Sequence, residues 1–237
     1  MVKLNGGKKK KFHNHMDYSL AKKYMTQHIE LFGDELYRMN DDSFISASSN
    51  SDSFHEALYS FKDSIENCEL CNLSLTRNKF VFGSGDSNAD LLLIGEGPGE
   101  EEDSKGEPFV GKAGKLLDKI LKSIGYVRDD NVFIANIIKC RPPENRNPLL
   151  SEIEKCTPYL YKQINLINPK LIVALGKVAG QTLTNKNMLI KEMRKQTHHY
   201  NNIPLVVTYH PAALLRNPSL KIDVWEDFQY IRNFMKS

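Results

Sequence analysis

The 237-residue chain is 41% hydrophobic with a formal net charge of +3, enough apolar sequence for one buried core with some chain left over. No apolar run approaches the roughly 18 residues of a membrane span, and no apolar segment of a secretory signal follows the lysine-rich start. The mildly basic balance is compatible with nucleic acid without being specific to it. We therefore expect a cytoplasmic protein of bacterial type without a membrane partner, in which cysteines stay reduced.

Residues 1–53 differ in composition from the rest of the chain. After the lysines, apolar residues near helical spacing at 19–39 predict one amphipathic helix, and a serine-rich linker follows at 41–53. We interpret this segment as a poorly ordered extension, because a lysine run is more often a solvated tail than a binding element. The folded domain is expected to span 54–237.

From residue 54 onward, apolar runs alternate with helical patterns. Strands are predicted at 89–95, 131–139, 170–176 and 203–211. A first helix is predicted at 112–125, and a second begins at Ser151, which has Glu154 in capping-box spacing. A short third helix follows the third strand and ends at about Thr184, and a last helix is predicted at 222–235. This alternation predicts an α/β fold of three layers, a doubly wound sheet of four parallel strands with helices on both faces. Ligands of such sheets bind beyond the carboxyl ends of the strands, so the segments that follow the strands are the candidate site.

The segment after the first strand combines glycines with five carboxylates between Glu96 and Asp103. It lacks the Gly-Lys-Ser/Thr of a phosphate-binding loop and the Gly-x-Gly-x-x-Gly of a dinucleotide site, and its acids would repel phosphates. A carboxylate held by a Gly-Pro-Gly turn suits activation of water or stabilisation of a developing cation, and Glu96 is that candidate. Phe109 follows where a ring can stack on a flat ligand. The alternative is an acidic surface loop with Phe109 in the core.

Polar side chains also follow the second and fourth strands. Asn136 carries an amide that can read a planar amide-like edge, and Arg141 and Arg146 behind it suit phosphates. His210 follows the fourth strand. Taken alone, each motif is also explained by a capped turn with solvated side chains. We favour a catalytic His210 because it shares its sheet edge with Glu96 and Asn136.

The chain has four cysteines, at Cys68 and Cys71 in a C-x2-C pair and then at Cys140 and Cys156. Four thiolates can hold a zinc ion or a [4Fe–4S] cluster. Zinc ribbons normally offer two tight pairs, so the wide second spacing modestly favours the iron–sulfur cluster. Buried cysteines that act as small apolar residues are the alternative.

Together, the motifs from about Cys68 to Pro218 resemble those of the family 4 uracil-DNA glycosylases, the iron–sulfur type. They read C-x2-C, G-E-x-P-G-x-x-E-D-x-x-G-x-P-F-V-G-x-A-G, N-x-x-K-C-R-P-P-x-N-R and H-P-A-x-L-L-R-N-P. The resemblance implies a monofunctional base-excision-repair enzyme that hydrolyses the N-glycosidic bond of deoxyuridine in single- or double-stranded DNA. It also implies the uracil-DNA glycosylase-like fold and a monomer that acts at the nucleoid. A catalytically weak DNA-binding protein of the same fold is the alternative.

By this resemblance, Glu96 lies beside the sugar and positions the hydrolytic water, and Phe109 stacks on the flipped uracil. Asn136 reads uracil O4 and N3–H, and His210 hydrogen-bonds uracil O2. The four cysteines hold a structural [4Fe–4S] cluster. We also expect the backbone of Gly95 and Gly97 to approach the ligand closely, and Glu102 to exclude the thymine methyl group. Leu214 is expected to fill the space that the flipped base leaves in the DNA stack. The expected phosphate contacts are Arg141, Arg146 and Arg216.

Gly97 departs from the family pattern, in which alanine is usual at this place. A relative with covalent chemistry has glutamine there, together with an Arg-Arg-x-His run. Residues 191–202 lack that run, so the covalent branch does not match.

Overall fold

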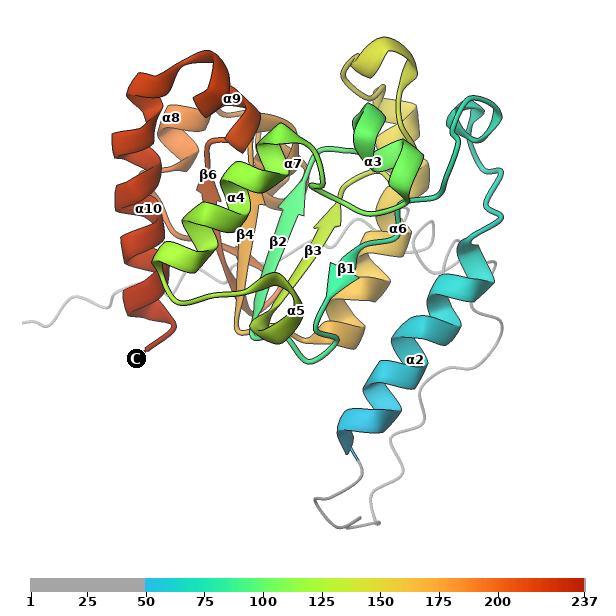
Figure 1. Ribbon diagram of the computed structural model, residues 1–237, viewed down its shortest axis with the longest axis horizontal. Coiled ribbons are helices and arrows are strands. Elements are labelled where there is room, and N and C mark those ends of the chain that lie inside the picture. Colours follow the sequence, from blue (N-terminus) through green and yellow to red (C-terminus); the bar gives the residue numbers. More distant parts are fainter. Residues whose placement is uncertain (1–49, 237) are drawn as a thin grey trace, which may run out of the picture. The chain divides into compact units, whose positions relative to one another are not determined.

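The computed structural model describes residues 50–236, with side chains from His55 onward (Figure 1). The helix predicted at 19–39 and nearly all of the predicted extension lie outside the described residues. The first described helix, α2 (Asn50–Ile65), begins inside the segment that was expected to be linker. Over residues 50–236, every helix is too short or too polar to cross a membrane.

A six-stranded sheet with the order β1-β3-β2-β4-β6-β5 forms the centre of the fold (Figure 1). Its four middle strands are parallel and match the predicted ones: β2 (Leu91–Gly95), β3 (Val132–Asn136), β4 (Leu171–Leu175) and β6 (Ile203–Thr208). Antiparallel edge strands β1 (Ser84–Gly85) and β5 (His198–Tyr200) make the sheet mixed and wider than expected. Their sequences gave no strand signal, because β1 has only two residues and β5 reads His-His-Tyr.

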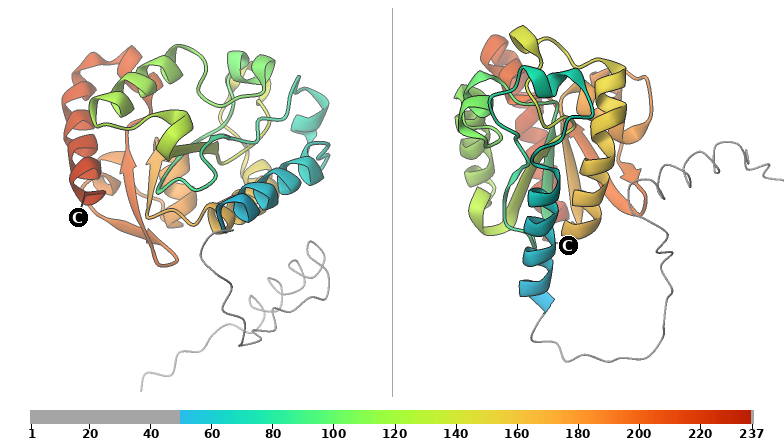
Figure 2. Two further views of the ribbon diagram at one scale, coloured as in Figure 1. Left: turned by 60° about the horizontal axis from the view of Figure 1, so that its bottom comes forward. Right: turned by 90° about the vertical axis from the view of Figure 1, so that its right-hand side faces the viewer.

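Helices cover both faces of the sheet, as the continuous apolar strands predict. Leu92 and Ile94 of β2 face one core, which α2, α6 (Leu150–Ile167) and α7 (Lys177–Thr184) complete. Leu91 and Leu93 face the other core, beneath α4 (Lys112–Ser123) and α10 (Lys221–Phe234). Figure 2 shows the sheet between these two layers.

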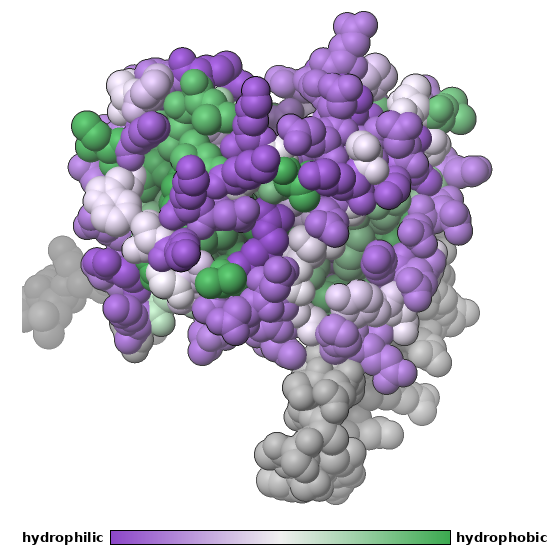
Figure 3. Space-filling model, in the orientation of Figure 1, coloured by the Kyte–Doolittle hydropathy of each residue, from purple (hydrophilic) through white to green (hydrophobic). Residues whose placement is uncertain are grey.

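Shorter helices connect the layers. They are α3 (Glu100–Lys105), α5 (Arg128–Asn131), α8 (Ile190–Met193) and α9 (Pro211–Arg216), with 3-10 turns η1 (Asn72–Leu75), η2 (Pro143–Asn145) and η3 (Pro218–Leu220). On the face drawn in Figure 3, hydrophilic residues dominate, and apolar residues are visible at upper left, where α4, α9 and α10 lie.

The capping box predicted for α6 is wrong, although the helix itself is present. Helix α6 begins at Leu150, and the carboxylate of Glu152 accepts a hydrogen bond from the backbone N–H of Leu149 at 2.7 Å. Glu152 therefore takes the capping role that the spacing of Ser151 and Glu154 had suggested.

Parallel register brings the carboxyl ends of the middle strands to one edge. Gly95 is opposite Asn136 where β2 and β3 end. The pairing continues past the strands, since Ile137 N–H donates to Gly95 O at 2.9 Å and Ile138 N–H donates to Glu96 O at 3.1 Å. The segments that carry the predicted site residues thus leave the sheet side by side.

Candidate active site

A pocket of about 540 Å³ opens at the carboxyl ends of the parallel strands, a size typical of small-molecule sites. Most of the predicted residues line it, from the ends of β2, β3 and β6: Glu96, Gly97, Glu102, Phe109, Asn136, Arg146, His210 and Arg216. Gly95, Arg141 and Leu214 do not form its wall. The structure therefore gathers residues that lie up to 120 positions apart in the sequence, Glu96 and Arg216, around one cavity.

Asn136 is the last residue of β3 and is only 2% exposed. Its side-chain oxygen Oδ1 is buried and has no hydrogen-bond partner among the described residues. A Cβ atom added to Gly95 would lie 2.5 Å from this oxygen, so the close approach needs glycine. An unpaired buried acceptor costs about 1–3 kcal/mol, which is recovered when a ligand N–H donates to it.

Phe109 is buried and has a left-handed backbone with φ of 54°. Its ring stacks beside that of His210, with centroids 5.2 Å apart and planes 29° apart. A non-glycine residue in this conformation costs roughly 1–3 kcal/mol and persists only where its surroundings impose it. Gly114 of α4 lets the turn approach closely, because a Cβ atom there would lie 1.6 Å from Phe109 O.

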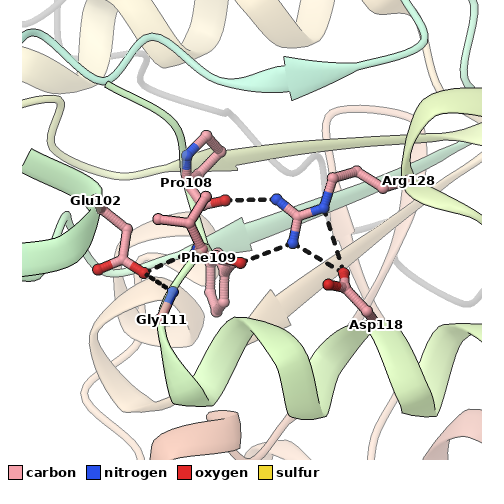
Figure 4. A network of polar contacts seen from close by, with 7 residues as sticks. Glu102, Pro108, Phe109, Gly111, Asp118 and Arg128 are labelled. Atoms are coloured by element: carbon pink, nitrogen blue, oxygen red, sulfur yellow. Dashed lines mark hydrogen bonds and ion pairs between the residues drawn. The ribbon is translucent and has the colours of Figure 1, made fainter. Parts of the chain in front are cut away.

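Glu102 supports the turn that carries Phe109. Its Oε1 accepts hydrogen bonds from the backbone N–H groups of Val110 and Gly111, each at 2.9 Å (Figure 4). Asp103 beside it is buried and accepts from the backbone N–H of Asn78 at 2.9 Å. Two of the acids in the glycine-rich segment therefore order backbone, a role that the sequence pattern did not distinguish.

Glu96 lies in the turn after β2, and its side chain is half-buried. Burial raises the pKa of the Glu96 carboxyl. Within residues 55–236, no hydrogen bond or ion pair engages this carboxylate, which leaves it available to a water or a developing positive charge.

His210 caps helix α9. Its Nδ1 accepts a hydrogen bond from the backbone N–H of Ala212 at 3.1 Å, so the proton of the neutral ring lies on Nε2. Burial, with a smaller contribution from the positive charge of Arg216, lowers the pKa of His210 to about 4, and Glu102 opposes the shift. At neutral pH the ring is therefore an uncharged donor at the pocket.

The predicted phosphate-binding arginines differ in their surroundings. Arg146 forms a two-fold contact with the Glu152 carboxylate, at 2.7 and 2.9 Å. Arg141 donates from Nε to Asn145 Oδ1 at 2.8 Å. Arg216 is exposed at the pocket wall. Arg216 thus has the side chain most available to an anion outside the pocket.

The assignment of Leu214 to the DNA stack stays a prediction, and its side chain is buried in the unbound protein. Leu214 is 2% exposed and packs in the core beneath α4 and α10, whereas Leu215 is 50% exposed. In a short helix the two neighbouring positions point in different directions, and only the packing of α9 decides which one is buried.

The four cysteines come from three separate segments and pack in the core beneath α2, α6 and α7, on the other side of the sheet from Leu214. Arg77 Nη1 lies 3.3 Å from Cys140 Sγ, the Lys139 N–H donates to Cys156 Sγ at 3.3 Å, and Tyr159 Oη lies 3.4 Å from Cys68 Sγ. In the described part of the chain, no set of three or more Cys, His, Asp or Glu side chains is arranged around a single metal ion.

The family model of the uracil DNA glycosylase superfamily matches residues 82–229, more than half of the chain. The chain belongs to the uracil DNA glycosylase superfamily. It is 41% identical over 184 residues to a type-4 uracil-DNA glycosylase of Archaeoglobus fulgidus, which covers 74% of this chain and 92% of that protein. It is 42% identical to one of Sulfurisphaera tokodaii, over 75% of this chain and 84% of that protein. A third, of Thermotoga maritima, is 41% identical over 73% of this chain and 91% of its own length. The predicted resemblance to the type-4 members is confirmed.

The glycine at position 97, where the resemblance led us to expect alanine, fits the local packing. A Cβ atom at Gly97 would lie 2.7 Å from Cγ1 of Ile138, so alanine would require that side chain to move. The glycine accommodates Ile138, which leaves β3 beside the loop. Glycine in place of alanine removes no polar group from the pocket of this chain.

Two arginines near the site were missed by sequence reasoning. Arg77 contacts Cys140, and its Nη1 also donates to Cys68 O at 2.7 Å. Arg128 donates to the carbonyl groups of Pro108 and Phe109 (Figure 4). Neither arginine lies in a motif that carries the resemblance to the uracil-DNA glycosylases, and backbone carbonyl acceptors leave no pattern in a sequence.

Proposed function

We propose that this protein hydrolyses the N-glycosidic bond of deoxyuridine in DNA, releasing uracil and leaving an abasic site. The observation that carries the proposal is the buried, unpaired Oδ1 of Asn136 in the pocket that also holds the neutral His210 ring and Phe109. Uracil offers an N–H donor between two carbonyl acceptors, which matches an amide on one side and a ring N–H on the other.

Recognition starts with removal of the base from the DNA stack, at a cost of a few kcal/mol. In the pocket, Asn136 Oδ1 accepts from uracil N3–H and its NH2 group donates to O4. The Phe109 ring stacks on the face of the base. One carboxylate oxygen of Glu102 accepts hydrogen bonds from the N–H groups of Val110 and Gly111. Glu102 also lines the pocket, where we propose that it excludes the methyl group of thymine.

Bond cleavage leaves a cationic sugar and a uracil anion. The His210 Nε2–H donates to O2, where negative charge grows, and does so without itself carrying charge. The Glu96 carboxylate stabilises the sugar cation and orients the attacking water. The two charges that develop are thus met on opposite sides of the breaking bond.

We assign phosphate binding to the rim, with Arg216 first because it is exposed, and Arg141 and Arg146 with it. Arg146 must share its guanidinium with Glu152 in this role.

Leu215 replaces Leu214 as the side chain that fills the vacated stack. Lys177 is exposed and lines the pocket, and we place it with the phosphate contacts. Because this lysine is then not a nucleophile that attacks the sugar, we propose a monofunctional enzyme. A cytoplasmic monomer acting on single- or double-stranded DNA completes the proposal.

We also propose that Cys68, Cys71, Cys140 and Cys156 hold a structural [4Fe–4S] cluster. The three donors directed at sulfur from Arg77, Lys139 and Tyr159 suit thiolate ligands, which are stabilised by hydrogen bonds. A four-iron cluster is wider than an ion, so its ligands stand farther apart than those of a single metal. The cluster would supply a cross-link between the segments, outside the chemistry of the pocket.

Replacing Cys140 with serine is expected to remove most of the iron and to lower the temperature of thermal unfolding, because metal binding stabilises the folded chain. Iron content and the broad absorbance at the blue end of the visible spectrum measure the first effect. Thr157→Ala is the control, since it alters a buried residue next to Cys156 and keeps every thiol. Anaerobically purified protein with stoichiometric zinc and no iron would contradict the cluster.

Base release from matched single strands with one deoxyuridine or one deoxycytidine tests the proposed function and the role of Asn136. Wild type is expected to release uracil and to leave cytosine, whose donor and acceptor are reversed. Asn136→Asp is expected to slow uracil release by about tenfold to a hundredfold, because each mismatched polar contact costs roughly 1–3 kcal/mol. A protonated aspartate pairs with both cytosine atoms, so slight cytosine release is expected.

Asn201→Asp, in the exposed turn between β5 and β6, is the matched control and should behave as wild type. Wild type that releases no uracil would refute the proposed function. Asn136→Asp that excises uracil at the wild-type rate would refute the reading role of Asn136 alone.

A further inference from the structure

We infer that Arg128 is a positioning residue, which acts through the backbone of the turn Pro108–Gly111 to hold the Phe109 ring where uracil stacks. The inference rests on the proposed function, because it assigns the ring its ligand. Arg128 and its partner Asp118 are absent from the pocket wall, so neither is placed to touch the base.

The guanidinium of Arg128 is bound to the carbonyl side of this turn. Nη1 donates to Pro108 O at 2.5 Å and Nη2 donates to Phe109 O at 2.8 Å. Asp118 on α4 fixes the guanidinium in turn, since its Oδ1 accepts from Nε at 3.3 Å and from Nη2 at 2.9 Å. The Arg128 side chain is 15% exposed, and its contacts with Pro108 O and Phe109 O are partly buried, whereas its contacts with Asp118 are exposed.

The opposite side of the turn is bound to Glu102. Figure 4 shows the turn between the two charged groups, with Gly111 toward the carboxylate and the carbonyls of Pro108 and Phe109 toward the guanidinium. The N–H of Val110 donates to the same carboxylate oxygen. Each group is charged, and hydrogen bonds to charged groups are stronger than those between neutral ones. The turn is therefore held from both sides in the conformation that it must keep.

That conformation is unfavourable for phenylalanine. Phe109 has φ of 54°, a region that residues with a Cβ atom rarely adopt. Without the guanidinium, two carbonyl groups lose their donors and the backbone can relax toward negative φ, which would move the ring away from His210 and Asn136. Lysine cannot replace the contact fully, because only the planar fork of arginine reaches two carbonyls and a carboxylate together.

The first test is a double-mutant cycle between Arg128 and Phe109, read by single-turnover uracil excision. Arg128→Met is expected to slow excision by about tenfold, with Arg128→Lys between it and wild type. In a Phe109→Ala background, the same Arg128→Met change is expected to have an effect of less than about twofold, because the ring on which it acts is gone. Lys170→Met is the control, since it removes the cation of the surface ion pair with Asp90 at the other end of the strands.

The second test needs no substrate. Amide hydrogen exchange at Val110 and Gly111 is expected to be at least about tenfold faster in Arg128→Met than in wild type, because the turn opens more often. Asp118→Asn, which keeps the arginine and loosens it, should give a smaller change in the same direction and serves if Arg128→Met does not fold.

Unchanged hydrogen exchange at both amides in these variants would overturn the inference. It would also be overturned if Arg128→Met slowed uracil excision by the same factor in the wild-type and the Phe109→Ala backgrounds. Failure of the proposed function has a different signature. Wild type would then release no uracil, while the exchange measurement would still decide whether Arg128 holds the turn.

Discussion

Replacing His210 with alanine is expected to slow uracil excision by about a hundredfold to a thousandfold at neutral pH, the usual effect of removing one donor to a developing anion. His210 is suited to that role because its Nδ1 accepts the hydrogen bond of Ala212 N–H. The one proton of the neutral ring is therefore on Nε2, from which it can be donated to uracil. The substitution leaves the phosphate-binding rim intact, so affinity for uracil-containing DNA should change little. Single-turnover rates and DNA binding measured side by side separate the two effects.

The pH dependence gives an independent check on His210. Burial lowers its pKa to about 4, so the ring is neutral throughout the range in which the enzyme is assayed. Protonation below that value would place a proton on Nδ1 and break the cap to Ala212. His199→Ala, an exposed histidine on the edge strand β5, is the matched control and should keep the wild-type rate. A near-normal rate in His210→Ala would remove His210 from the mechanism.

Glu96→Gln is expected to slow excision by about a hundredfold or more, because the amide keeps the shape of the side chain and loses the charge that faces the sugar cation. The variant should not be less stable than wild type at neutral pH. Burial raises the pKa of Glu96, so the ionised carboxylate in the folded protein is disfavoured relative to the unfolded chain, and that penalty disappears in the amide. A slow but stable variant would separate catalysis from folding.

The acid limb of the wild-type pH–rate profile belongs to this carboxylate in our proposal. Activity needs the ionised form and is lost as pH falls through the raised pKa of Glu96, and Glu96→Gln should lack this loss at pH values above the pKa of His210, about 4. Glu107→Gln tests the specificity of the effect, since Glu107 is exposed in the same segment and does not line the pocket. If Glu96→Gln retained both the rate and the acid limb, the assignment of the sugar-facing charge would fail.

Much of the fold and the site was predictable because it depends on local patterns. Continuous apolar runs such as 91–95 and 171–175 are typical of buried parallel strands, and parallel strands end at one edge. That rule alone was sufficient to place Glu96, Asn136 and His210 in one pocket. The motifs around them, taken in order, were specific enough to indicate the family.

Tertiary structure decided what depends on partners distant in sequence. The packing of α9 against α4 buried Leu214 and left Leu215 exposed, and no local pattern distinguishes two adjacent leucines. The edge strands β1 and β5 form because a neighbouring strand offers free backbone groups to them, not because of their own sequences. Arg128 and Arg77 act through backbone carbonyls and sulfur atoms that the fold brings to them. The strained turn at Phe109 is bound on its two sides by Glu102 and Arg128, which lie 26 positions apart in the sequence.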